Sequence, residues 1–340
     1  MASRLIPCPV CGNAEHFHAL WSARGNRQVP FLASEHPVVL CARCGFCFLN
    51  PQHEDADYGR YYLLHDRPVD KTVTIADIEG NAVKAGYDRL RYRFLSRFLS
   101  DKNARIFEIG SGYGRFLKRM SDDGYRNLSG CEPNEQAVRV AQAQFGFDIR
   151  RASLQTLTLR ESSVDVALLI AVIDHFTDPV AALGRIGQLL KPGGLLYVNV
   201  LNLGDVVLRK GINKYFKFVH TVYFTEASLF NCLKKAGFEI VMSKTLPANR
   251  ACSTWRTPEN YTYSELNVMA RRPSGQVRTD ADIMPEDWQK IARRLRRAWT
   301  VDRRYFFIHR VWTKIKKLPI CGRFIERWRT SRMPNPLRET

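Results

Sequence analysis

Between residues 105 and 200, short apolar segments alternate with longer amphipathic ones, and this order constrains the fold more than any other feature of the sequence. The short segments have the length of strands, and apolar residues in the longer segments recur at helical spacing. Strands separated by helices form a parallel sheet with helices on both faces. The expected strands are 105–109, 128–131, 148–151, 164–170 and 195–200, and the expected helices are 87–99, 115–122, 135–145 and 179–190.

The chain after residue 200 predicts a different end to this sheet. A helix at 226–236 leads to a strand at 238–244, and a last strand is expected at 264–270. No helical pattern is evident between these two strands, so we expect them to pair antiparallel. The predicted fold class is therefore α/β, with a mostly parallel sheet and an antiparallel last strand.

The first strand ends in a glycine-rich turn. Glu108 precedes Gly110, Gly112 and Gly114, which alternate with other residues just before a helix. The spacing is not the GxGxxG dinucleotide fingerprint, and no Gly-Lys-Ser/Thr is present to hold a phosphate and Mg²⁺. A ligand that approaches the backbone closely and has no phosphate at this turn fits better. Glu132, at the end of the second strand, is placed to accept both hydroxyls of a ribose.

Two CxxC pairs, each followed by glycine, predict a metal site near the N-terminus. The first pair is Cys8 and Cys11, and the second is Cys41 and Cys44. Four thiolates complete the tetrahedral coordination of Zn²⁺ and leave no open position, so the predicted role is structural. The alternative is four free cysteines in a small apolar lobe. Three histidines between the pairs are alternative ligands: His16, His18 and His36.

Composition and charge divide the chain into four regions. We expect a zinc-binding head at 1–51, a tyrosine-rich connector at 52–80, the strand-and-helix body at 81–272 and a basic, helical extension at 273–340. The last region holds most of the formal charge of +19. Nine cysteines, placed unevenly, argue against a secreted disulfide framework. With no signal peptide and no apolar run of membrane-spanning length evident, we expect a cytoplasmic location.

Over residues 80–272 the sequence resembles the class I S-adenosylmethionine-dependent methyltransferases, which have a Rossmann-like fold. Glu108 and the GxGxG turn are similar to the first motif of the family, and Glu132 to its ribose-binding acid. The resemblance implies that S-adenosylmethionine contacts Gly110, Ser111, Gly112 and Gly114. Where the family has an acid for the adenine, this chain has Ser153, Leu154 and Gln155. The stretch 190–194 is similar to the family's Leu-Lys-Pro-Gly-Gly turn.

Two further stretches bear on catalysis. Residues 170–175, ending in Asp174 and His175, resemble the family's Leu-Glu-His stretch after the fourth strand. The cysteine pairs, the connector and the run that begins at His220 resemble bacterial zinc-binding methyltransferases, among them sugar C-methyltransferases. Those proteins have Tyr-His-Glu-His before the helix, and here only the last histidine matches. The missing Tyr and Glu count against C-methylation, and O-methylation of a sugar or a similar small hydroxyl compound fits the remaining pattern better.

A hydroxyl acceptor needs a general base, and His220 is the first candidate because histidine is substantially neutral at cytosolic pH. A histidine that bonds a loop carbonyl is the structural alternative. His175 and Tyr61 are the next candidates. Asp174 contacts the cofactor or the substrate in one interpretation and caps the next helix in the other. Tyr61 and Tyr62 either cover the substrate or pack.

Three functions remain open at this point. The first is methylation of a small, sugar-like molecule, such as a glycan precursor. The second is RNA methylation, with the zinc head and the basic extension in contact with RNA. The third is a scaffold with a methyltransferase fold and no activity, which would require a damaged cofactor turn.

The basic extension contains two amphipathic segments. The first has Trp288, Ile291, Leu295, Ala298 and Trp299 at helical spacing, with arginines and lysines between them. The second, at 303–317, repeats this pattern. One interpretation is that both helices pack on the body. The other is peripheral attachment to an anionic membrane surface on the cytoplasmic side, through lysines, arginines and interfacial tryptophans.

Overall fold

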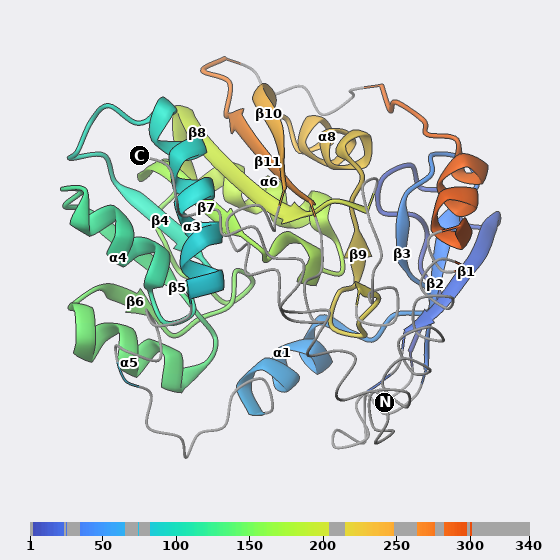
Figure 1. The fold of residues 1–340 in the computed structure, drawn as a ribbon, viewed down its shortest axis with the longest axis horizontal. Helices are drawn as coiled ribbons and strands as arrows, with labels where there is room; N and C mark the ends of the chain where they lie inside the picture. The colour runs from blue at the N-terminus through green and yellow to red at the C-terminus, as the bar shows by residue number, and fades with distance from the viewer. Residues whose placement is uncertain are drawn as a thin grey trace, which may run out of the picture.

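The computed structural model describes residues 3–23, 25, 35–64, 74, 82–203, 215–247, 264–275, 282–297 and 300, and it contains two sheets (Figure 1). The strands are β1 (Phe17–Ala23), β2 (His36–Cys41), β3 (Cys47–Leu49), β4 (Ile106–Ile109), β5 (Leu128–Cys131), β6 (Asp148–Arg150), β7 (Val164–Ile170), β8 (Leu190–Leu201), β9 (Val222–Tyr223), β10 (Glu239–Pro247) and β11 (Ser264–Arg271). The helices are α1 (Asp55–Leu64), α3 (Ala82–Leu95), α4 (Arg115–Asp122), α5 (Glu135–Phe145), α6 (Pro179–Leu189) and α8 (Glu226–Lys235), with 3-10 turns η2 (Ser96–Phe98) and η3 (Ile173–His175).

The large sheet has the strand order β10-β11-β8-β7-β4-β5-β6. β4, β5, β6, β7 and β8 run parallel to their neighbours in this group. β11 is antiparallel to both β8 and β10. The predicted fold class is confirmed, including the antiparallel pairing of the last two strands.

Helices cover both faces of the large sheet, as parallel strands require. Apolar side chains of α3, α4 and α5 form one core with the sheet, and those of α6 and α8 form the core on the other face. Helix starts follow from capping side chains. Asn134 accepts a hydrogen bond from the backbone of Ala137 at the start of α5, and Asp178 does the same for Ala181 at the start of α6. Because Asp178 caps α6, the capping role considered for Asp174 is not needed.

The stretch at 190–194, expected as a turn, belongs to β8. The β7–β8 register places Val164 opposite Leu190 and Val166 opposite Leu195, so the glycines form a bulge in the strand. The backbone N–H of Gly193 donates to Arg272 O at 2.9 Å, and Arg272 N–H donates to Gly194 O at 2.9 Å. The expected turn is part of the strand because its backbone hydrogen bonds to Arg272 continue the antiparallel pairing of β8 with β11.

The small sheet has the order β1-β2-β3-β9, and its last strand comes from the body of the chain. Cys47 and Phe48 of β3 pair with Tyr223 and Val222 of β9. The head and the body also share one apolar core, in which the head residues Val10, Phe46 and Phe48 are found with Phe224 and Leu229 of the body. The head therefore packs directly against the body, in addition to its connection through the chain.

The first part of the basic extension packs on the small sheet. Residues 288–297 are helical (the orange helix beside β1 and β2 in Figure 1). Ala292 and Leu295 are buried in a cluster with side chains of β1 and β2, and Trp288 packs against the same cluster. This apolar stripe is used in packing. Ala298, Trp299 and the second amphipathic segment lie outside the described residues.

Among the described residues, none of the helices has the length and apolar character of a membrane span.

Candidate functional site

A cavity of about 1470 Å³ opens at the carboxyl ends of β4, β5 and β7, which is the edge where open α/β sheets bind ligands. The cavity is lined by the glycine turn after β4, the loop after β6, α1 and the η3 turn. The volume exceeds the ~300–1,000 Å³ typical of a site for one small molecule. A cofactor and a second molecule can therefore be accommodated together.

The three glycines of the turn adopt left-handed backbone conformations, with φ of +69° at Gly110, +55° at Gly112 and +74° at Gly114. A Cβ at Gly110 would lie 2.7 Å from Cγ2 of Val172. Residues with side chains rarely adopt such φ values, and here the space for one is also filled. The turn therefore requires glycine, and it brings bare backbone to the cavity wall.

Glu132 lies at the end of β5 on the cavity wall, as the sequence predicted. One carboxylate oxygen accepts a hydrogen bond from Gly112 N–H at 2.9 Å, and the other accepts from Asn134 N–H at 2.9 Å. These bonds fix the carboxylate. Each oxygen keeps a second lone pair, so the group can still accept hydroxyl hydrogens from a ribose.

Three buried polar atoms at the glycine end of the cavity have no hydrogen-bond partner among the described residues. They are Oε2 of Glu108, Oγ of Ser111 and Nη1 of Arg115. Burial, with the charges of Asp88 and Glu132, raises the pKa of Glu108 well above its usual range. A ligand with both an ammonium and a carboxylate group would satisfy these atoms, and the amino-acid end of S-adenosylmethionine fits this requirement.

Ser153 and Leu154 also reach the cavity wall, in the loop after β6. The backbone N–H of Ser153 donates to Oγ1 of Thr156 at 3.0 Å, which closes a tight turn. Leu154 is buried and offers an apolar surface. These two residues offer an apolar and backbone surface on which an adenine ring could be held.

A cluster of two histidines and one carboxylate lies at the end of β7. Nε2 of His175 is 3.8 Å from Oδ1 of Asp174, and Nδ1 of His220 is 3.6 Å from Oδ2 of the same residue. The two imidazole rings are nearly perpendicular, with centroids 4.9 Å apart. Oδ1 of Asp174 is buried without a hydrogen-bond partner. The sequence named all three residues, and the fold brings them together.

The histidines differ in access to the cavity. His175 lines it, whereas neither His220 nor Asp174 is among the lining residues. Burial lowers the pKa of His220 to about 4, against the opposing effect of Asp174, so His220 is neutral near pH 7. The cavity position makes His175 the stronger candidate for contact with a substrate.

The tyrosines of α1 differ in the same way. Tyr62 lines the cavity, and its hydroxyl forms a short hydrogen bond with Nδ1 of His175. Tyr61, which the sequence analysis named, packs against Tyr62 and Phe218, with ring centroids 5.4 and 5.2 Å away, and is not a lining residue. Helical geometry turns adjacent residues by about 100°, and the sequence alone did not indicate which tyrosine faces inward.

Sequence reasoning also missed Asp88, Arg91 and Arg115, which line the glycine end of the cavity. Arg115 follows the third glycine directly, and this position could have identified it. Asp88 and Arg91 are polar residues of an amphipathic helix, and no local pattern separates them from solvent-facing ones.

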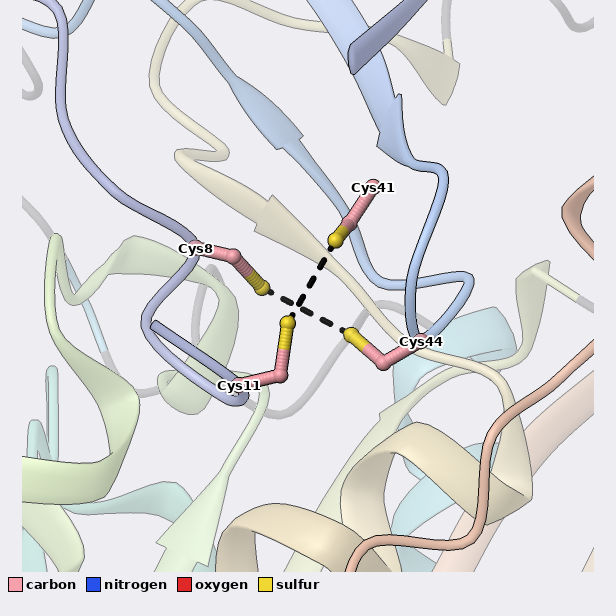
Figure 2. A group of neighbouring side chains, drawn as sticks. All are labelled: Cys8, Cys11, Cys41 and Cys44. Carbon is pink, nitrogen blue, oxygen red and sulfur yellow. Dashed lines mark hydrogen bonds between the residues drawn. The ribbon is translucent and has the colours of Figure 1, made fainter. Parts of the chain in front are cut away.

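The four cysteines of the two CxxC pairs converge on one point (Figure 2). The sulfur of Cys8 lies 3.6 Å from that of Cys44, and the sulfur of Cys11 lies 3.5 Å from that of Cys41. Tetrahedral Zn²⁺ with bonds of ~2.3 Å needs sulfurs at nearly this separation. The four thiolates could hold a structural zinc ion, and the histidines between the pairs are not part of this cluster.

The second cysteine pair also contacts the C-terminal extension. Glu286 N–H donates to the carbonyl of Cys44 at 3.2 Å, and a Cβ at Gly45 would lie 2.9 Å from Glu286. Asn231 of α8 exchanges two hydrogen bonds of 2.9 Å with the backbone of Met284. Residues 284–286 therefore contact both the proposed zinc site and α8.

Comparison with known proteins agrees with the geometry of the cavity. A family model described as a methyltransferase domain matches residues 83–243. Ubiquinone biosynthesis O-methyltransferase of Cereibacter sphaeroides is 28% identical over 182 residues, which cover 48% of this chain and 71% of the relative. The enzyme of that name from Ruegeria pomeroyi is 30% identical over 169 residues, 44% of this chain and 66% of the relative.

Residues 83–243 form a class I S-adenosylmethionine-dependent methyltransferase domain. Among solved structures, an S-adenosylmethionine dependent methyltransferase from Mesorhizobium loti is 21% identical with a TM-score of 0.45, over 57% of this chain and 100% of that one. The cofactor of this methyltransferase domain is S-adenosylmethionine. The glycine turn, Glu108 and Glu132 line the cavity in which this cofactor could be held.

The methyltransferase should lose cofactor affinity when Gly110 is replaced by alanine. The new Cβ would meet Val172 at 2.7 Å and displace the turn, so we expect the Kd for S-adenosylmethionine to rise about 10-fold or more. Gly124→Ala is the matched control, because Gly124 also has positive φ but has no atom within 4 Å of its Cβ position. Calorimetric titration of both variants tests this, and equal affinities would contradict it.

Proposed function

We propose that this methyltransferase transfers a methyl group to a hydroxyl of a small molecule, with a sugar or glycan precursor as the acceptor class. The observation that carries the proposal is His175, which lines the cavity in contact with Tyr62 and beside the buried carboxylate of Asp174. Bound S-adenosylmethionine supplies an activated methyl group on a sulfonium. The chain must then orient the acceptor and remove its proton.

The hydrogen bonds of His175 indicate which nitrogen accepts the proton. In this proposal Nδ1 carries the hydrogen and shares it between the carbonyl oxygen of Val219, 3.0 Å away, and the hydroxyl of Tyr62, so that Nε2 keeps its lone pair. Oδ1 of Asp174, 3.8 Å from Nε2, stabilises the imidazolium that forms when Nε2 takes up a proton. His220 contacts the other oxygen of Asp174 and helps to hold this carboxylate in place.

The names of the relatives support an oxygen acceptor, since both are O-methyltransferases of ubiquinone biosynthesis. The sugar class is supported by the resemblance of the head and connector to zinc-binding sugar methyltransferases. The size of the cavity supports an acceptor that binds beside the cofactor.

The test is an acceptor panel with methyl-labelled S-adenosylmethionine and the full-length chain. The panel contains sugars and nucleotide sugars, phenolic compounds and bulk RNA, and NMR of each labelled product identifies the methylated atom. Metabolites from cells with and without the gene, compared by mass spectrometry for the gain of one CH₂ unit, identify the natural acceptor. Label on sugar oxygens supports the proposal. Label on phenols alone rejects the sugar class, and label on nitrogen, carbon or RNA rejects O-methylation of a small hydroxyl compound.

A further inference from the structure

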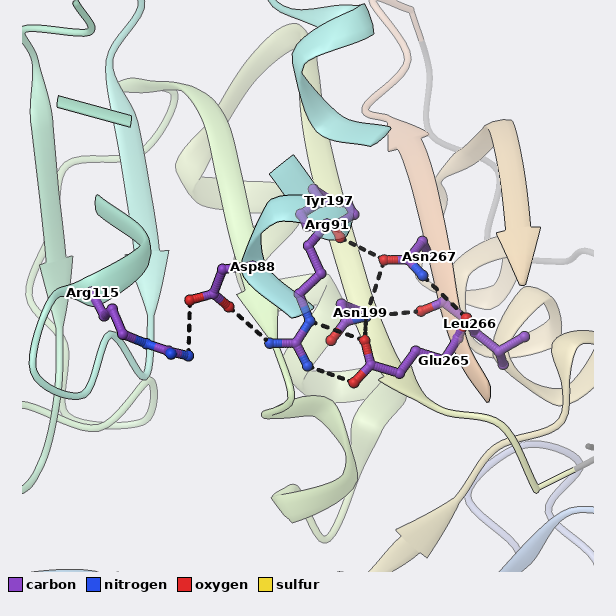
Figure 3. Close-up of polar contacts among 8 residues, drawn as sticks. All are labelled: Asp88, Arg91, Arg115, Tyr197, Asn199, Glu265, Leu266 and Asn267. Atoms are coloured by element: carbon purple, nitrogen blue, oxygen red, sulfur yellow. Dashed lines mark hydrogen bonds and ion pairs between the residues drawn. The ribbon is translucent and has the colours of Figure 1, made fainter. Parts of the chain in front are cut away.

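Two polar networks reach the cavity from different sides. The first joins the large sheet to the glycine end (Figure 3). Glu265 of β11 binds Arg91 of α3 at 2.6 Å, and Arg91 contacts Asp88 at 3.2 Å. Asp88 lies 2.8 Å from Arg115 at the start of α4, and the buried Asn199 donates to Glu265 at 3.0 Å. None of these groups belongs to α1, so this network holds the glycine end independently of α1.

The second network starts at Glu132, the candidate ligand of the ribose. One oxygen of this carboxylate accepts a hydrogen bond from Asn134 N–H at 2.9 Å. The side-chain oxygen of the buried Asn134 caps α5, and Nδ2 of the same amide donates to the backbone carbonyl of Tyr62 at 3.3 Å. The carbonyls in the last turn of a helix have no donor within the helix, and Tyr62 is in the last turn of α1. Asn134 therefore connects the end of α1 to the loop that carries Glu132.

The side chain of the same tyrosine contacts the proposed base. The hydroxyl of Tyr62 forms the short hydrogen bond with Nδ1 of His175 and lies 3.4 Å from the carbonyl oxygen of Val219. At the start of α1, Oδ1 of Asp55 accepts a hydrogen bond from the hydroxyl of Thr177. The body thus binds α1 at both ends. Tyr62 contacts the ribose loop with its backbone and the proposed base with its side chain.

The described apolar packing of α1 is small. Tyr58, Tyr61 and Tyr62 form a cluster with Phe218, separate from the two cores on the faces of the large sheet. Elements with few buried apolar contacts open locally at a lower free energy than core elements. The position of α1 therefore depends on its polar contacts and on the ligand that fills the cavity, since α1 is part of the cavity wall.

We propose that Asn134 and Tyr62 are positioning residues that couple the two ends of the cavity through α1. A cofactor whose ribose is held at Glu132 also contacts the wall formed by α1, so its binding favours the position of α1 in which Tyr62 orients His175. The acceptor then meets an oriented base in the cofactor-loaded protein. The role of His175 rests on the proposed function, whereas the coupling can be measured without an acceptor.

The experiment is hydrogen exchange, followed by mass spectrometry, on the full-length chain with and without saturating S-adenosylhomocysteine. In the wild type we expect exchange to slow about 10-fold at three places. These are the glycine turn, the last turn of α1, and the turn at 217–220 that His220 N–H closes on the carbonyl of Lys217 at 3.1 Å.

Asn134→Ser separates the two ends of the cavity. Serine keeps an oxygen that can cap α5, and the variant lacks the amide donor to Tyr62. The glycine turn should still respond to S-adenosylhomocysteine, whereas α1 and the turn at 217–220 should not respond.

Tyr62→Phe keeps the ring and removes the hydroxyl. In this variant the last turn of α1 should respond as in the wild type, and the turn at 217–220 should respond less. With the acceptor that the panel identifies, kcat should fall about 2- to 10-fold, as for the loss of one hydrogen bond, while the KM for S-adenosylmethionine stays the same.

Asn127→Ser is the matched control. Nδ2 of Asn127 donates to the backbone carbonyl of Asn103 at 2.6 Å, and neither residue lines the cavity, so all three places should respond. The proposal is overturned by a wild type in which the glycine turn responds and α1 does not, or by an unchanged response of α1 in Asn134→Ser. Neither result bears on the acceptor class, which the panel decides. If the glycine turn of the wild type does not respond, the cofactor assignment fails and the coupling fails with it.

Discussion

Replacement of His175 by alanine is expected to lower kcat by about 10²- to 10⁴-fold while the Kd for S-adenosylmethionine stays nearly unchanged. His175 lines the cavity and contacts Tyr62, Val219 and Asp174, none of which belongs to the glycine turn. Its replacement should therefore remove the proposed proton acceptor and leave the residues of the turn in place. Initial rates at saturating substrates, with calorimetry on the same preparation, measure the two effects separately.

The matched variants are His220→Ala and His16→Ala. The side chain of His16 is exposed and does not belong to the cluster of Asp174, His175 and His220, so its replacement should have no effect. His220 reaches Asp174 but not the cavity, so we expect a smaller loss of kcat than in His175→Ala. If His220→Ala instead lowers kcat more than His175→Ala does, His220 is the base. A rate that EDTA abolishes and Mg²⁺ restores would mean that a cation, not a histidine, activates the hydroxyl.

Loss of the proposed zinc should destabilise the whole described body and not only the head. A head attached to the body only through its connector would unfold alone. The structure shows that Phe46 and Phe48 of the head share a core with Phe224 and Leu229, and that β3 pairs with β9. Because metal binding contributes folding free energy, its removal should lower the thermal midpoint and the cofactor affinity together.

Elemental analysis should find about one zinc per chain, and Cys44→Ser should lose it. Cys47→Ser is the control, because Cys47 is buried in the same region but its sulfur is not part of the cluster. It should keep the metal while it loses some stability. A metal-free preparation that is fully folded and active would contradict the zinc assignment.

The sequence by itself determined the features that depend on local chemistry. Apolar periodicity located the strands and helices of the large sheet, because side chains on one face of an element recur at a fixed spacing. The backbone has positive φ at Gly110, Gly112 and Gly114, a conformation that favours glycine, so the turn could be recognised from its glycines. The two-residue gap within each CxxC pair identified the four sulfurs that converge.

The tertiary structure decided everything that depends on contacts between distant parts of the chain. The pairing of β3 with β9 and the ion pair between Arg91 and Glu265 each join residues more than 170 positions apart, and neither side carries a local signal for its partner. The choice of His175 over His220, and of Tyr62 over Tyr61, depends on which side chain faces the cavity. A sequence pattern indicates whether a residue prefers a buried or an exposed position. The residues that it contacts are determined only when separate elements pack into one core.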